Sequence, residues 1–314
     1  MTDAGPRLLL GSPIAATIRG RLAEEMAEFA DRHGYAPTLA IVFVGKDAPS
    51  AVYLQQILRS CASVGAIGRV VDLPEDCTTR HLRDEIEVLN ADPEVSGIIV
   101  QMPLPKRIPI RAVIDAIDPS KDIDGLHPMN AGLLSEGYDG FLPATAQAAV
   151  EILKRSGIEL EGRHVVVVGR SNVVGKPAAL LLLRENATVT VCHSRTVDLA
   201  SHTRAADIVI VAAGRPGLIR GEMLKPGAIV VDVGINVVAG GIVGDVDFAS
   251  ASHVAAAISP VPGGVGPVTN AILMGHLLDA ARAHVDARAA GNGHAGDRAD
   301  RSQPADAGAN PARA

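Results

Sequence analysis

The feature that most constrains the fold of this chain is a strand, a glycine-bounded turn and a helix in direct succession. The apolar strand at 165–168 is followed by the turn Gly169-Arg170-Ser171-Asn172-Val173-Val174-Gly175. The helix after it carries Pro177 in its first turn, where the missing backbone N–H costs no hydrogen bond. Such a helix start presents free N–H groups that favour an anion such as a pyrophosphate. The sequence therefore predicts a nucleotide-binding unit within an α/β fold.

Strands and helices alternate on both sides of this unit. Apolar strands are expected at 39–44, 70–73, 97–101, 164–168, 188–192, 208–212, 229–233 and 254–258. Helices are expected at 13–33, 50–64, 78–90, 110–117, 146–156 and 268–288. This alternation predicts parallel sheets with crossover helices.

The length of 314 residues favours about two domains. We expect a first α/β domain at 1–145, completed by the returning helix 268–288, and a second, Rossmann-like domain at 146–267. From Ala289 onward alanine is the only aliphatic residue, so 289–314 is expected to be a disordered tail.

Composition excludes several classes of protein. The formal net charge of −6 argues against nucleic acid as the main partner. No apolar run reaches about 18 residues and no leader pattern precedes the first helix, so a cytoplasmic protein without membrane contact is expected. Cys61, Cys77 and Cys192 are too scattered for a disulfide framework or a zinc site, and no other metal-ligand spacing occurs.

Basic residues stand where a dinucleotide site often carries an acid. The turn 169–175 is not the usual G-x-G-x-x-G fingerprint, although its context of strand and helix fits. The next strand ends in Ser194 and Arg195 rather than an acid that would hold a ribose 2′-OH, and Arg170 lies in the first turn. These groups suit a 2′-phosphate, which favours NADP over NAD. The alternative is that both arginines are solvated loop charges.

Later strand ends are expected to reach the same crevice. Gly214 and Gly234 follow two further strands and would allow close approach of a nicotinamide, although ordinary loop glycines are the alternative. The run at 260–267, Pro-Val-Pro-Gly-Gly-Val-Gly-Pro, is too rich in proline and glycine for a helix or central strand. It predicts a fixed backbone surface suited to a flat ligand.

Five motifs resemble one known family. They lie at 100–105, 121–125, 168–175, 232–236 and 260–269. With them the chain resembles, from about 14 to 285, the bifunctional methylenetetrahydrofolate dehydrogenase/methenyltetrahydrofolate cyclohydrolases, the FolD family. The resemblance implies NADP, a folate substrate and a homodimer paired through the cofactor domains. It also implies oxidation of 5,10-methylenetetrahydrofolate to the 5,10-methenyl cation and hydrolysis of that cation to 10-formyltetrahydrofolate, in one-carbon metabolism.

The resemblance also implies roles for particular residues. Tyr53 would lie against the pterin-side rings, Gln101 would orient the acid-base group, and Asp124 would accept hydrogen bonds from the pterin. The wall of the folate slot would comprise Pro260, Gly263 and Gly264. The cofactor contacts would comprise Gly169, Arg170, Ser171, Val174, Gly175, Ser194, Arg195, Gly214, Gly234 and Ile235. The alternatives are a half-buried helix residue for Tyr53, a strand-end cap for Gln101 and a turn residue for Asp124.

The chain departs from the family pattern at two places. The family helix reads Ser-x-x-Tyr-x-x-x-Lys, and here Ile57 stands at the lysine position, four residues after Tyr53. Neighbouring Gln56 and Arg59 are poor bases. Isoleucine cannot transfer a proton, so we expect the dehydrogenase activity and slow or absent hydrolysis. The family's Pro-Cys-Thr-Pro-x-Gly linker is also altered, at 143–148.

Two other functions remain open from the sequence. One is a paralogue that binds folate and NADP without turnover, which the missing lysine favours and Gln101 and Asp124 disfavour. The other is an unrelated two-domain dehydrogenase with a histidine base, for which His127 and His193 are the nearest candidates. Neither histidine sits in a catalytic constellation.

Overall fold

Two parallel sheets form the framework of the protein. The computed structural model describes residues 5–45 and 48–300. The smaller sheet has the strand order β3-β2-β4, and the larger has the order β1-β11-β8-β7-β5-β6. All neighbouring strands in both sheets run parallel, which confirms the predicted α/β fold.

The smaller sheet belongs to the N-terminal half. It consists of β2 (Thr38–Val44), β3 (Ile67–Leu73) and β4 (Val95–Val100). Its crossover helices are α2 (Ala48–Val64) and α3 (Thr79–Ala91), and the short α4 (Ile110–Ile114) follows β4. Every residue of β2 and β4 is buried: β2 is the central strand, and the edge strand β4 packs against α10.

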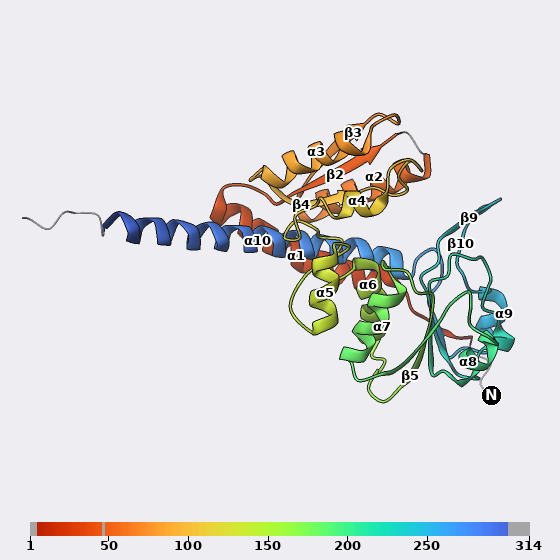
Figure 1. Ribbon diagram of the computed structural model, residues 1–314. Helices are drawn as coiled ribbons and strands as arrows, with labels where there is room; N and C mark the ends of the chain where they lie inside the picture. The colour runs from red at the N-terminus through yellow and green to blue at the C-terminus, as the bar shows by residue number, and fades with distance from the viewer. Residues whose placement is uncertain (1–4, 46–47, 301–314) are drawn as a thin grey trace, which may run out of the picture.

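The larger sheet carries the predicted nucleotide-binding unit. Its strands are β1 (Arg7–Leu8), β5 (His164–Val168), β6 (Thr188–Cys192), β7 (Ile208–Val211), β8 (Ile229–Asp232) and β11 (Ala257–Ile258). Its short connecting helices are α7 (Gly175–Arg184), α8 (Leu199–Ala205), η1 (Gly221–Met223) and α9 (Phe248–Ser252). An antiparallel hairpin, β9 (Asn236–Val238) and β10 (Gly241–Val243), projects beyond the sheet (Figure 1).

Three helices join the two halves. The long α10 (Val265–Asp300) packs along α1 (Gly11–His33) and α6 (Ala144–Arg155), and it also contacts β4 and α2. Figure 1 shows α10 running between the smaller sheet and the larger one. The short α5 (Pro128–Glu136) precedes α6 and lies next to α6 and α7 in this view. One apolar cluster includes Ile41 of the smaller sheet and Val165 of the larger. A continuous core therefore fixes the two halves to each other.

The ends of the chain differ from expectation. β1 pairs with β11 and so belongs to the larger sheet, although residues 7–8 were expected in the first domain. Two residues are too few to show a strand period, so the sequence gives no signal there. Residues 289–300, which were expected to belong to a disordered tail, continue α10 in the structure. Alanine and arginine are strong helix formers, and extending an existing helix needs no new nucleus. Residues 301–314 of the expected tail lie outside the described residues.

No helix in the described part of the chain is long and apolar enough to cross a membrane.

Candidate active site

The turn after β5 is closed by two backbone contacts that only glycine permits. Gly169 has φ +131°, and a Cβ there would lie 2.1 Å from the carbonyl oxygen of Ala212. A Cβ on Gly175 would lie 2.2 Å from the carbonyl oxygen of Gly169. The Ser171 hydroxyl accepts from the Val174 N–H at 3.1 Å, and α7 then begins at Gly175. The predicted strand, turn and helix are present. In the first turn of α7 the Lys176 N–H donates to the Ser171 carbonyl at 3.1 Å and Pro177 has no N–H, so the groups open to an anion are those of the exposed residues 170–173.

The other predicted cofactor residues lie on the same edge of the sheet. Ser194 and Arg195 follow β6, Gly214 follows β7, and Gly234 and Ile235 follow β8. Because β8, β7, β5 and β6 are parallel neighbours in that order, their carboxyl ends share one edge. The structure therefore brings the predicted cofactor residues together.

Basic side chains at this edge are available to a ligand. Arg170 and Arg195 are both exposed, and neither forms an ion pair within the described residues. His193 is occupied otherwise, because its Nδ1 accepts from the Arg195 N–H at 3.1 Å. His127 caps α5 through its own Nδ1, which accepts from the Met129 N–H at 3.0 Å. Neither histidine is placed as a catalytic base.

Two buried aspartates that the sequence did not single out support these strand-end loops. Asp232, at the end of β8, accepts from the N–H groups of Gly234, Asp245 and Val246 at 2.9–3.0 Å. Burial, with a smaller contribution from Asp245, raises the pKa of Asp232 to about 6. Asp245 in turn accepts from the loop after β7. Both are loop-ordering groups. Asp232 begins the 232–236 motif but was assigned no role from the sequence, and Asp245 lies outside the motif.

Tyr53 and Asp124 lie close enough to influence each other's ionisation. Tyr53 comes from α2, and its hydroxyl donates to Oδ1 of Asn270 on α10 at 3.4 Å. Burial, and secondly the charge of Asp124, raises the pKa of Tyr53 to about 12. Burial, and secondly the charge of Asp122, raises the pKa of Asp124 to about 7. A carboxyl group in this environment is ready to exchange a proton or to accept a ligand's N–H groups.

The two aspartates of the 121–125 motif have different surroundings. Asp122 accepts from the N–H groups of Leu126 and His127 at 3.2 and 2.7 Å and from Nδ2 of Asn130 at 2.8 Å. Asp124 is half-buried, and its carboxylate has no hydrogen bond to any described residue. Asp122 therefore builds the turn, which leaves Asp124 for a ligand.

His276 on α10 packs against the turn that carries Asp124 and contacts its backbone. Its Nδ1 lies 2.7 Å from the carbonyl oxygen of Ile123, and its Nε2 lies 2.9 Å from Oε1 of Gln147 on α6. Burial lowers the pKa of His276, so the neutral ring is favoured. Sequence reasoning missed both His276 and Asn270. Their signal was a polar residue within the apolar part of the last helix.

Gln101 carries an unsatisfied buried atom. It directly follows β4, its N–H donates to the Val42 carbonyl at 2.8 Å, and its Nε2 donates to the Met102 carbonyl at 2.9 Å. Its Oε1 is the one buried side-chain polar atom without a partner in the described part of the chain. Such an atom is costly unless a ligand or water supplies a donor.

The loop at 260–264 is fixed between the larger sheet and the long helices. It follows β11 and precedes α10, and Gly263 accepts from the Gly11 N–H at 2.9 Å. A Cβ on Gly11 would lie 1.8 Å from the Gly264 carbonyl oxygen, so the backbones touch. Pro260, Gly263 and Gly264 therefore lie just before the α10 turn that carries Asn270, the partner of Tyr53.

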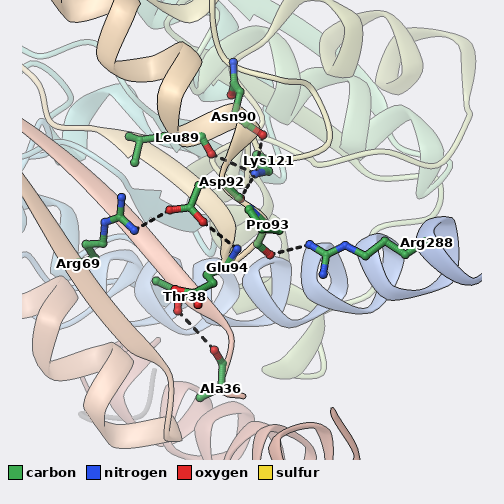
Figure 2. A network of polar contacts seen from close by, with 10 residues as sticks. All are labelled: Ala36, Thr38, Arg69, Leu89, Asn90, Asp92, Pro93, Glu94, Lys121 and Arg288. Atoms are coloured by element: carbon green, nitrogen blue, oxygen red, sulfur yellow. Dashed lines mark hydrogen bonds and ion pairs between the residues drawn. The ribbon is translucent and has the colours of Figure 1, made fainter. Parts of the chain in front are cut away.

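No lysine of the described site stands in for the lysine that the family resemblance implies at position 57. The Ile57 side chain is 1% exposed and belongs to the apolar core, whereas Gln56 and Arg59 point to solvent. Lys121 is committed elsewhere (Figure 2), since its ammonium donates to the carbonyls of Leu89, Asn90 and Asp92 at 2.7–3.0 Å. It thereby caps the C-terminal end of α3, where a positive charge is favoured.

The described residues contain no cluster of three His, Cys, Asp or Glu side chains that could hold a metal ion. The site as a whole offers a nucleotide edge, an available carboxylate and an unsatisfied amide oxygen. It offers no lysine ammonium beside Tyr53.

Comparisons with known proteins match both halves of the chain to one family. Residues 9–124 match the catalytic domain of tetrahydrofolate dehydrogenase/cyclohydrolase, and residues 143–285 match its NAD(P)-binding domain. A bifunctional protein FolD 1 from Rubrobacter xylanophilus is 50% identical over 277 residues, covering 88% of this chain and 97% of that protein. FolD from Chloroflexus aurantiacus is 47% identical, with the same coverage.

Solved structures agree with these sequence relatives. FolD from Campylobacter jejuni superposes with a TM-score of 0.85 at 44% identity, covering 88% of this chain and 98% of that one. The Trypanosoma brucei enzyme, complexed with NADP cofactor and an inhibitor, gives a TM-score of 0.87 at 40% identity, with coverage of 90% and 99%.

Proposed function

Since the chain belongs to the tetrahydrofolate dehydrogenase/cyclohydrolase family, we propose that it is an NADP-dependent 5,10-methylenetetrahydrofolate dehydrogenase of one-carbon metabolism. The one-carbon bridge loses a hydride, which bound NADP⁺ accepts to give NADPH and the 5,10-methenyl cation. The chain's own residues bind and orient the two reactants, because hydride transfer depends chiefly on positioning.

The observation that carries this proposal is the glycine-closed turn at 169–175 with two exposed arginines beside it. Gly169 and Gly175 let the backbone approach a pyrophosphate, and Arg170 and Arg195 supply unpaired positive charge for a 2′-phosphate. The relative from Trypanosoma brucei was solved with NADP, which agrees with this preference. The residues present therefore fit the cofactor.

On the folate side we assign a role to each predicted residue. Asp124 accepts hydrogen bonds from the pterin amino and ring N–H groups, since its carboxylate has no protein donor among the described residues. Tyr53, held by Asn270, offers a ring face and a hydroxyl. Gln101 turns its unsatisfied Oε1 towards the reacting centre. Pro260, Gly263 and Gly264 form a wall of the slot.

We further propose that hydrolysis of the methenyl cation is slow or absent. Water addition needs a proton acceptor near the attacking oxygen and a donor for the departing nitrogen. Ile57 supplies neither, and Lys121 is held by three backbone carbonyls. Loss of a general acid-base group lowers a rate by about 10²- to 10⁴-fold.

The test compares substrates on one preparation. Methylenetetrahydrofolate with NADP⁺ should give NADPH, seen by its absorbance, and NAD⁺ should serve less well. Binding of both ligands without NADPH formation would support the non-catalytic paralogue instead. Methenyltetrahydrofolate supplied alone should disappear no faster than in buffer. Turnover of it at a rate well above buffer would show that another group replaces the lysine.

We also propose a cytoplasmic homodimer paired through the cofactor domains. The three cysteines, all free and buried, suit a reducing compartment. The hairpin β9–β10 exposes apolar side chains, with Val237 72% and Ile242 46% exposed, and Ile235 beside it is 66% exposed. A second copy would cover such a patch. Sedimentation should give a dimer, and Val237→Asp should dissociate it. A monomeric wild-type protein would refute the pairing.

A further inference from the structure

The loop after β7 wraps its N–H groups around a carboxylate of the protein itself. Ala213 and Gly214 donate to Oδ2 of Asp245 at 2.6 and 2.8 Å, and Arg215 donates to Oδ1 at 2.8 Å. Three consecutive N–H groups facing one point form a typical anion-binding concavity. Here Asp245, which is fully buried, already occupies it.

The fourth donor to this carboxylate comes from the loop after β8. Asn236 directly follows the predicted cofactor residue Ile235, and its Nδ2 donates to Oδ1 of Asp245 at 2.8 Å. Both carboxylate oxygens of Asp245 therefore accept two hydrogen bonds each. The carboxylate joins two neighbouring strand-end loops that are predicted to meet the cofactor.

Asp232 fixes Asp245 in turn. It accepts from the backbone N–H of Asp245 at 3.0 Å, and its own N–H donates to the Ser259 hydroxyl at 2.8 Å. Two glycines pack too closely against these carboxylates to carry a side chain. A Cβ on Gly234 would lie 2.3 Å from Cγ of Asp245, and a Cβ on Gly244 would lie 1.8 Å from Oδ2 of Asp232. The two carboxylates and two glycines form one close-packed unit.

Resting on the proposed function, we infer that Asp245 is a positioning residue for the cofactor. Its carboxylate holds loop 213–215 in the shape against which the nicotinamide half lies. It also occupies that loop's N–H groups, so they are closed to a phosphate. The anionic groups of the dinucleotide are thereby directed to the turn at 169–175, whose residues 170–173 are exposed. Asp245 acts through these loops and touches no reacting atom.

The test is Asp245→Asn, with Asp247→Asn as the matched control. Asparagine keeps the size but places an NH₂ group against two of the four donors. The affinity for NADP⁺, measured by calorimetry without folate, should fall by about tenfold. Amide hydrogen exchange at 213–215 should accelerate in the ligand-free protein. Asp247 caps α9 by accepting from the Ser250 N–H, and its replacement should change neither quantity.

Asn236→Ala decides the matter if Asp245→Asn does not fold. It removes one donor and keeps both carboxylates, so a weakening of about threefold with faster exchange at 213–215 is expected. Unchanged NADP⁺ affinity in the folded variant, with or without faster exchange, would overturn the inference. If wild-type protein binds no NADP⁺, the proposed function fails, and this inference fails with it. Wild-type binding with no effect of the variant defeats the inference alone.

Discussion

The cofactor edge and the folate side of this protein differ in how completely their polar groups are satisfied. At the cofactor edge, Asp232 and Asp245 together accept seven hydrogen bonds, six from backbone N–H groups and one from Asn236. On the folate side, Gln101 Oε1 has no partner and Asp124 has none among the described residues. The carboxylates of the cofactor edge are fully bonded without ligand, whereas the folate side retains polar atoms without a hydrogen bond to any described residue.

This difference separates positioning from proton transfer. Hydride transfer needs a rigid cofactor surface, which the bonded loops provide. Hydration needs a proton acceptor for the attacking water and a donor for the departing nitrogen, and the position at which the family resemblance implies a lysine holds the buried Ile57. The two activities of the family therefore have unequal support in this chain.

The largest expected change comes from restoring the lysine. Ile57→Lys should raise hydrolysis of methenyltetrahydrofolate by about 10²-fold or more, because a general acid-base group is regained. The melting temperature should fall, since position 57 lies in the apolar core. The loss of methenyltetrahydrofolate is followed spectrophotometrically.

Ile57→Met is the matched control for that experiment. Methionine has an unbranched chain like that of the introduced lysine but carries no charge, so hydrolysis should stay at the background rate. Equal hydrolysis by the wild type and the lysine variant would mean that Ile57 does not limit the reaction.

The next effect concerns Asp124. Asp124→Asn should lower kcat/KM for methylenetetrahydrofolate by about 100-fold, through loss of charge-assisted hydrogen bonds to the pterin. The dissociation constant for NADP⁺ should not change. Asp122→Asn provides the contrast, because Asp122 holds the turn through Leu126, His127 and Asn130. It should lower the free energy of unfolding. If both variants lower kcat/KM equally, the assignment of Asp124 to the pterin and of Asp122 to the turn would be contradicted.

A smaller effect is expected at Lys121, which like Asp122 is a fully bonded residue of the 121–125 motif. Lys121→Met leaves three carbonyls at the end of α3 without their donor. The free energy of unfolding in urea should fall by about 2 kcal/mol, while kcat stays within twofold. A large loss of kcat in a stable variant would place Lys121 in the chemistry and contradict this account.

The smallest effect is a pH dependence. The pKa of Asp124 is raised to about 7, so its neutral form dominates below that pH and its carboxylate above it. If the carboxylate binds the pterin, kcat/KM should rise about tenfold from pH 6 to 8. Asp124→Asn should flatten this rise. If kcat/KM of the Asp124→Asn variant still rises between pH 6 and 8, a titrating group other than Asp124 causes the pH dependence.

Much of the fold followed from sequence periodicity. The apolar strands at 39–44 and 164–168 are buried on both faces, so their runs were long and easily recognised. Hairpin β9–β10 has three-residue strands with exposed side chains, too short for an alternating pattern. The extension of α10 past 288 was missed because alanine fits both a helix and a disordered segment.

The candidate site was recovered less evenly. Glycine turns and Asp124 belong to local motifs that the sequence displays directly. Asn270 and His276 serve the site only through contacts with Tyr53 and Ile123, which are more than 150 residues away along the chain. Asp245 acts on a loop about 30 residues earlier. Such pairings depend on the tertiary fold, which spacing alone does not show.

The most direct measurement is the ratio of products in one reaction. Methylenetetrahydrofolate and NADP⁺ are mixed with wild-type protein, and NADPH and methenyltetrahydrofolate are each quantified after separation by chromatography. One methenyl cation should accumulate for each NADPH formed, with only the buffer's slow hydrolysis afterwards. NADPH formation without accumulation of the methenyl cation, or no NADPH at all, would contradict the account.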